Sequence, residues 1–178
     1  DLVSIIDIGK TKINVGTPTS HAGSTSFKAI KLAFDSIQKK IADAVVTAPV
    51  SKTSFHLAQI NYPGQTEIFA DLCGSKKYMM IFLSSKMICG LTTIHEPIKN
   101  VSRLITKKRL ELSINVLNET FRNDLGIKNP SIALLGLNPH AGENGKIGKE
   151  ELEIINPLIK SFSKNASGTN APLIFIFF

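Results

Sequence analysis

Short apolar runs alternate with amphipathic helical patterns along this chain, and that alternation constrains its fold more than any other feature. The runs have the length and composition of buried strands. They lie at residues 41–47, 78–83, 87–94 and 131–137. Between them, apolar residues recur at helical spacing. The alternation predicts an α/β fold: a layered, mixed or partly parallel sheet with helices on both faces.

Three helices follow from the periodicity. The first covers residues 27–37, and Ser24, Thr25 or Ser26 can cap it. The second starts at Thr106 and ends near Gly126. The third starts near residue 148. Three acidic residues lie near its N-terminal end, where they interact favourably with the positive end of the helix dipole: Glu150, Glu151 and Glu153.

The last residues, 173–178, form a wholly apolar run that is too short to span a membrane. We expect this tail to be an exposed, aggregation-prone edge of the sheet unless another segment covers it.

Composition narrows the function classes. Hydrophobic residues make up 43% of the 178 residues, which excludes a disordered chain. The net charge of +7 suits an anionic partner such as nucleic acid, an acidic membrane or a phosphorylated metabolite. The basic excess is spread along the chain without aromatic interleaving, so we expect neither a nucleic-acid nor a membrane partner. Cys73 and Cys89 form no Cys-x-x-Cys pair, which favours a reducing cytoplasm.

Two histidines follow predicted strands. His95 comes after the run 87–94 and His140 after the run 131–137. Ligands of open α/β sheets collect beyond the carboxyl ends of strands, where neutral imidazoles can bind a divalent metal. Either histidine alone is more commonly a packing residue. Their shared placement favours one ion between them, with a nitrogen separation no greater than about 5 Å, although a catalytic zinc usually takes three protein ligands.

Other polar segments carry weaker signals. Residues 63–67 indicate a turn and a helix start that Thr66 can cap; alternatively, Gln65 and Thr66 hydrogen-bond a polar substrate. Residues 142–148 are rich in glycine and could cradle a phosphate, but they match neither a P-loop nor the dinucleotide motif. His21 and His56 are expected at the surface.

Four motifs in a fixed order carry a family resemblance. They are DAVVTAPVSK at residues 43–52, GQTE at 64–67, TTIH at 92–95 and GLNPHAGE at 136–143. Together they closely resemble the 4-hydroxythreonine-4-phosphate dehydrogenase family of pyridoxal phosphate biosynthesis. The resemblance extends over about residues 9–165.

The resemblance implies a cytoplasmic homodimer that oxidises and decarboxylates 4-phosphohydroxy-L-threonine with NAD and a divalent metal, which could be Zn, Mg or Co. It implies a two-domain fold similar to isocitrate and isopropylmalate dehydrogenases. His95 and His140 match two of the three metal histidines of the family, and Gln65 and Thr66 match its substrate-contacting His-Thr pair. Neither catalytic nor NAD-binding residues can be assigned.

Three departures qualify this expectation. The third metal histidine of the family lies downstream of Phe178, and Gln65 stands where the family has a titratable histidine. The family's first and last segments have no counterpart, so residues 1–178 look like the central part of the enzyme, incomplete at both ends, with weak or no activity alone. Two alternatives stay open: a paralogue acting on another phosphorylated hydroxy acid, such as a four-carbon sugar-acid phosphate, and a non-catalytic remnant or interaction module.

Overall fold

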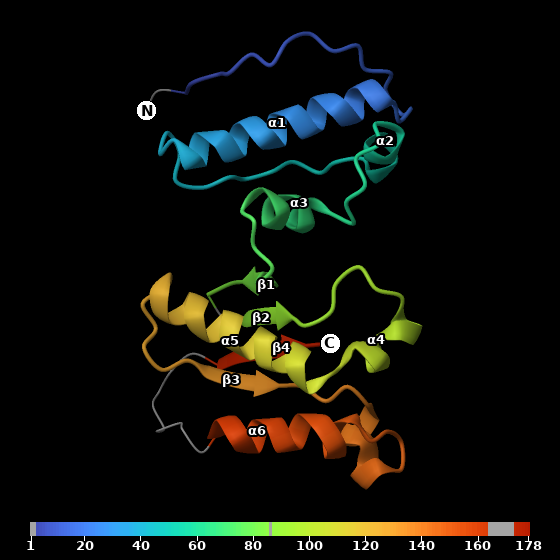
Figure 1. Cartoon of the computed structure of the whole chain (residues 1–178), viewed down its shortest axis with the longest axis vertical. Helices are drawn as coiled ribbons and strands as arrows, with labels where there is room; N and C mark the ends of the chain where they lie inside the picture. The colour runs from blue at the N-terminus through green and yellow to red at the C-terminus, as the bar shows by residue number, and fades with distance from the viewer. Residues whose placement is uncertain (1–2, 86, 164–172) are drawn as a thin grey trace. The chain divides into compact units, whose positions relative to one another are not determined.

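The computed structural model describes residues 3–85, 87–163 and 173–178. The chain divides into two compact units, Asp1–Lys76 and Lys77–Phe178. The elements of both units are labelled in Figure 1. Among the described helices, none combines the length and the apolar character that crossing a membrane requires.

The first unit is built from helices. They are α1 (Ser20–Gln38), α2 (Lys52–Leu57) and α3 (Gln65–Leu72). One buried side chain from each helix forms the centre of its small core: Ile30, Phe55 and Ile68. Phe27 adds an edge-to-face contact with Phe55, with ring centroids 6.3 Å apart. His21 and His56 lie on exposed positions of these helices, as predicted.

Helix α1 begins earlier than the periodicity indicates. Its N-cap is Thr19, whose hydroxyl accepts a hydrogen bond of 3.1 Å from the backbone N–H of Ala22. The predicted caps, residues 24–26, therefore lie inside the helix. The additional first turn contains Gly23, where a Cβ would lie 2.1 Å from the Ser54 carbonyl oxygen. Only glycine lets α1 approach α2 this closely, which explains why the apolar stripe starts later than the helix.

The predicted strand at residues 41–47 is wrong. This segment belongs to no sheet, because every strand among the described residues lies in the second unit. Ile41 is 73% exposed and Val46 is 99% exposed. A strand forms only where a neighbour pairs with its backbone N–H and C=O groups, and sequence composition does not reveal that neighbour.

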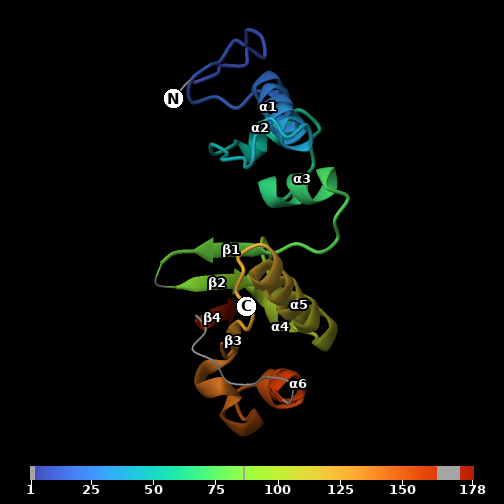
Figure 2. The ribbon, with the colours of Figure 1, turned by 90° about the vertical axis from the view of Figure 1, so that its left-hand side faces the viewer.

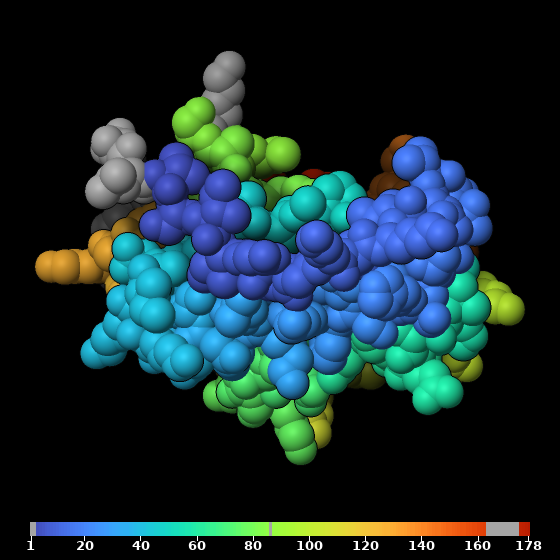
Figure 3. Space-filling model, turned by 90° about the horizontal axis from the view of Figure 1, so that it is seen from above, coloured from blue at the N-terminus to red at the C-terminus, as the bar shows by residue number. Residues whose placement is uncertain are grey.

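The N-terminal segment lies along α1. The Lys28 ammonium donates a 2.9 Å hydrogen bond to the carbonyl of Ile8, and Thr25 bonds the Thr11 hydroxyl. Figure 3 shows this dark-blue segment crossing the lighter-blue surface of the helix. Apolar side chains of the segment stay exposed, among them Ile5 at 90%.

The second unit contains a four-stranded mixed sheet. Its strands are β1 (Met80–Leu83), β2 (Ile88–Leu91), β3 (Ser131–Leu134) and β4 (Leu173–Phe177), in the order β1-β2-β4-β3. β1 and β2 form an antiparallel hairpin, whose connection includes Lys86, outside the described residues. β4 runs parallel to both β2 and β3. The predicted mixed sheet is therefore confirmed.

Among its described residues, the second unit also contains three α-helices, of which the last two pack against one face of this sheet. They are α4 (Ile98–Leu104), α5 (Lys107–Asn123) and α6 (Asn156–Ser163), with the 3-10 turn η1 (Pro139–Gly145) and the π-helical turn η2 (Glu151–Ile155) before α6. In Figure 2, α5 and α6 lie on the same side of the strands. The core joins fully buried side chains of α5 to the sheet and to α6: Leu110, Leu117, Phe121, Leu158 and Ile176.

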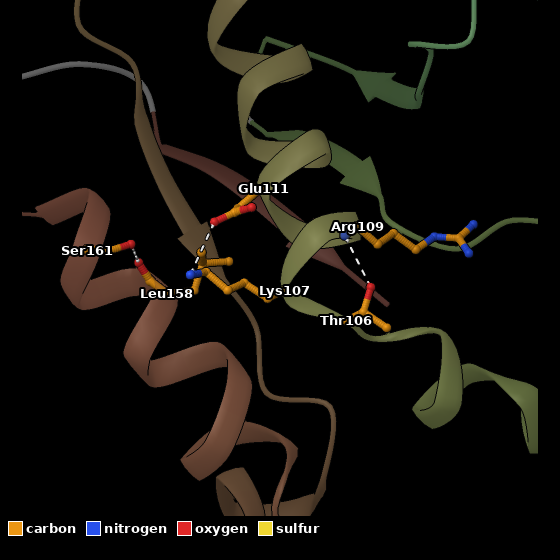
Figure 4. Close-up of polar contacts among 6 residues, drawn as sticks. All are labelled: Thr106, Lys107, Arg109, Glu111, Leu158 and Ser161. Carbon is orange, nitrogen blue, oxygen red and sulfur yellow. Dashed lines mark hydrogen bonds and ion pairs between the residues drawn. The ribbon is translucent and has the colours of Figure 1, made fainter.

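Local polar contacts explain where α5 begins. Thr106 caps it by accepting a 3.3 Å hydrogen bond from the N–H of Arg109 (Figure 4). Lys107 and Glu111 form an exposed i,i+4 ion pair of 3.8 Å on the first turn. The start at Thr106 confirms the sequence prediction, and Gly126 follows the helix with a positive φ of 68°. On α6, the Ser161 hydroxyl donates to the Leu158 carbonyl at 2.7 Å.

The apolar tail is not an edge. As β4 it occupies the middle of the sheet, with β2 on one side and β3 on the other, and Ile176 is 0% exposed. The sequence predicted an exposed edge unless another segment covers the tail. Two strands, β2 and β3, cover it. Its apolar composition is that of a central strand.

Truncation of the tail's buried side chain is expected to destabilise the second unit strongly. Ile176→Ala should lower the free energy of unfolding by about 2–5 kcal/mol, because it leaves a cavity between the sheet and α5. Urea denaturation followed by circular dichroism measures this loss. The control is Ile98→Ala, which removes the same atoms from a side chain that is 91% exposed. Equal effects of the two substitutions would contradict the central position of β4.

Candidate functional site

The carboxyl ends of β2 and β3 meet at one edge of the sheet. Both strands run parallel to β4, so they point in the same direction on either side of it. In Figure 1 the segments that follow β2 and β3 leave the sheet at the same end. His95 lies on the first segment and His140 on the second, and both side chains are exposed. The topology thus brings the two histidine-bearing segments to one edge.

Both histidines have a left-handed backbone. The φ angle is 57° at His95 and 52° at His140. The turn after His140 continues left-handed through Ala141, Gly142, Glu143 and Asn144, with φ between 45° and 76°. Each non-glycine residue in such a conformation costs roughly 1–2 kcal/mol. Strained backbone of this kind persists only where the surroundings hold it.

Asn138 and Glu151 form the main support of this turn. The Glu151 carboxylate accepts a 2.7 Å hydrogen bond from the backbone N–H of Asn138 and a 2.8 Å bond from its side-chain amide. Glu151 is only 3% exposed. Burial acts to raise the pKa of Glu151, but the hydrogen bonds from Asn138 outweigh it and leave the pKa below its ordinary value.

Glu150 extends the network to a second segment. One of its carboxylate oxygens accepts a hydrogen bond from the Asn138 side chain at 2.8 Å, and the other accepts one from the Ser102 hydroxyl on α4. The bond from Ser102 is the largest contribution that lowers the pKa of Glu150. The sequence pattern predicts only a helix-dipole role for Glu150 and Glu151, so this role in the network was missed. The available signal was the pair of carboxylates directly after Gly148, close to a polar loop.

The two histidines are candidate metal ligands, because both are exposed on segments that leave the same end of the sheet. Within the described part of the chain, no group of three or more His, Cys, Asp or Glu residues could hold an ion. Exposed imidazoles at one sheet edge fit a divalent metal chemically, as two of its ligands. A complete catalytic site then requires a further donor from elsewhere.

Arg109 closes the end of β2 against α5. Its Nε donates a 3.1 Å hydrogen bond to the carbonyl oxygen of Thr92, just beyond the strand. Through this bond, Arg109 holds the start of the segment that carries His95. The hydroxyl oxygen of Thr92 is buried and makes no hydrogen bond with the described residues.

Gln65 and Thr66 begin helix α3 in the first unit. The N-cap is Gly64, without a side-chain cap, so the prediction that Thr66 caps the helix is wrong. The Gln65 side-chain amide donates a 3.1 Å hydrogen bond to the carbonyl of Ala48, which joins two of the segments that the sequence analysis singled out. The Gln65 Oε1 atom is buried and has no hydrogen bond with the described residues.

The network around Asn138 should make the stability of the chain depend on pH. The folded pKa of Glu151 lies below the unfolded value of about 4.3, so its stabilisation is complete above that value and is lost as the pH falls through the folded pKa. Glu151→Gln should therefore unfold at lower urea than wild type at pH 7, and the gap should shrink below about pH 4.

The exposed neighbour Glu153 provides the control for this experiment. Glu153→Gln should follow the wild-type urea midpoint across the same pH range. A gap between wild type and Glu151→Gln that stays constant from pH 7 to pH 3 would contradict the assigned contacts.

Comparison with known proteins adds independent findings. Residues 1–174 match the family model described as pyridoxal phosphate biosynthetic protein PdxA. The chain is 33% identical over 171 residues to a 4-hydroxythreonine-4-phosphate dehydrogenase of Sulfurihydrogenibium sp., covering 96% of the chain and 53% of that relative. A Geobacter metallireducens protein of the same name is 35% identical, with coverages of 97% and 50%. The chain thus spans about half the length of the curated relatives it matches.

Solved structures agree with the fold. The crystal structure of 4-hydroxythreonine-4-phosphate dehydrogenase from Klebsiella pneumoniae matches with a TM-score of 0.78 and 28% identity, covering 92% of this chain and 54% of that one. A terephthalate 1,2-cis-dihydrodiol dehydrogenase from Burkholderia xenovorans matches with a TM-score of 0.58 at 19% identity, over 96% and 60% of the two chains. The second likeness concerns the fold alone.

Proposed function

Since the chain belongs to the pyridoxal phosphate biosynthetic protein PdxA family, we propose that it is the central part of an NAD- and metal-dependent dehydrogenase. Its substrate would be 4-phosphohydroxy-L-threonine, which is oxidised at a hydroxyl-bearing carbon and then decarboxylated. The relatives are named for this substrate. Dimerisation of the enzyme is part of the same proposal.

The shared edge of β2 and β3 is the observation that carries the proposal. It gathers His95 and His140 where α/β enzymes commonly bind ligands. A divalent metal held by these imidazoles would act as a Lewis acid on the substrate's oxygen. The two histidines would serve as ligands in their neutral form, so they must be deprotonated for binding. No residue of the described chain is assigned to NAD.

Gln65 bears on the identity of the substrate. Its amide nitrogen is engaged by Ala48, which leaves Oε1 as an acceptor for a hydroxyl or ammonium donor of the substrate. A glutamine cannot transfer a proton near neutral pH as a histidine can. This difference favours, as a second candidate, a paralogue that acts on another phosphorylated hydroxy acid. The third candidate, a non-catalytic protein, predicts that no metal binds.

Metal binding is expected to depend on the two edge histidines. Titration calorimetry with Zn²⁺ or Co²⁺ should show that His95→Ala and His140→Ala each weaken binding at least tenfold, because each removes one imidazole ligand. His21→Ala and His56→Ala remove exposed histidines of the first unit and should leave the affinity unchanged. Binding that survives the loss of both edge histidines would rule out the proposed ligands.

Catalysis by the 178-residue chain alone is expected to be weak or absent, because the described residues contain no complete metal donor set. NADH formation at 340 nm, with 4-phosphohydroxy-L-threonine and a fixed divalent metal, measures it. Turnover at an ordinary enzymatic rate of about 1–10³ per second would contradict this expectation. A parallel panel of phosphorylated hydroxy acids, measured with a longer protein that includes this chain, separates the first two candidates.

A further inference from the structure

The two histidine-bearing segments are joined by a continuous set of hydrogen bonds. Ser102 lies on α4, the helix that follows His95, and it bonds Glu150. Glu150 in turn bonds the side chain of Asn138, which precedes His140 on the other segment. Only these three side chains are needed to cross from one segment to the other. The β2 and β3 strands do not pair with each other, so this link does not follow from the sheet itself.

Glu151 holds the same asparagine from a second direction. It accepts bonds from both the backbone and the side chain of Asn138, which fixes the residue's position and rotamer together. A buried carboxylate is well suited to this role, because it offers acceptors only and forms charge-assisted bonds. Glutamine at this position would present an NH₂ group to a donor and would lose at least one of the two bonds.

Two glycines show how closely the network is packed. A Cβ at Gly148 would lie 2.3–2.6 Å from the side-chain atoms of Asn138. A Cβ at Gly142 would lie 2.5 Å from the Gly148 carbonyl oxygen and 2.9 Å from the Glu151 carboxylate. The left-handed turn is therefore built directly onto the network, and no side chain fits between them.

We propose that Glu150 and Glu151 are positioning residues that hold the left-handed turn of His140 and couple it, through Asn138 and Ser102, to the segment of His95. The turn has non-glycine residues in a left-handed backbone, and the network supplies the contacts that maintain it. The effect of this coupling on metal binding rests on the proposed function. The coupling between the segments is a property of the chain without metal and can be tested separately.

Nuclear magnetic resonance of the metal-free 178-residue chain tests the coupling. Ser102→Ala removes an exposed hydroxyl from α4, so it should not disturb the core. It should nevertheless shift the amide signals of residues 138–145 and the imidazole signals of His140. Glu150→Gln should shift signals on both segments. Hydrogen exchange at residues 139–145 should accelerate about tenfold or more in Glu151→Gln.

Matched controls separate coupling from general loosening. Ser161→Ala removes another serine hydroxyl of the same unit, one whose hydrogen bond to the Leu158 carbonyl stays within α6. Glu153→Gln changes an exposed carboxylate two residues from Glu151. Neither should affect residues 138–145. If Glu151→Gln fails to fold, Ser102→Ala still decides the question. Unchanged signals of residues 138–145 in Ser102→Ala, together with Glu150→Gln effects confined to its own segment, would overturn the proposal.

Metal titration adds a readout that a purely structural role would not move. Under the proposal, Glu151→Gln should raise the dissociation constant of Co²⁺ by about ten- to a hundredfold, the usual effect of losing a residue that orients a ligand. Ser102→Ala should raise it in the same direction, and Ser161→Ala should leave it unchanged. If the wild-type chain binds no Co²⁺, the proposed function fails while the resonance experiment still decides the coupling. Wild-type affinity in both network variants would overturn the positioning role.

Discussion

The parallel pairing of β4 with two strands is the interaction on which the second unit depends. β2 and β3 have no hydrogen bonds to each other, and β4 supplies the backbone partners of both. Because the two strands flank β4 in the same direction, their carboxyl ends share one edge. The shared edge, and with it the proximity of the His95 and His140 segments, is therefore a consequence of one strand's position rather than of either histidine's surroundings.

Much of the second unit could be predicted from local pattern. The helical spacing of Leu110, Ile114, Leu117 and Phe121 identified α5, and all four side chains are buried. The runs 78–83 and 87–94 correctly indicated strands, because they contain β1 and β2. The place of β4 in the sheet could not be predicted, because an apolar run indicates a strand but not its neighbours. Strand order depends on pairing between residues far apart in the chain, which periodicity does not record.

In the first unit and at the candidate site, local sequence pattern was not sufficient to predict the structure. Residues 41–47 have strand composition, yet no partner strand is present among the described residues, and Val46 is almost fully exposed. The motif around His140 indicated a candidate site from the sequence alone. Its left-handed backbone and its supports could not be foreseen, since they depend on side-chain contacts with Glu150 and Glu151 and on the close packing of Gly148. Residue types at a site can be recognised from a motif, whereas the contacts that hold them are three-dimensional.

The central place of β4 has a consequence for synthesis on the ribosome. Residues 173–177 emerge after β1, β2 and β3, so the β1–β2 hairpin and β3 cannot join into one sheet until its middle strand becomes available. At a translation rate of about 5–20 residues per second, the interval between β3 and β4 lasts a few seconds, during which apolar strand edges are uncovered. A nascent chain of this protein therefore passes through a stage in which chaperone binding can compete with collapse, and the arrival of one short segment ends that stage.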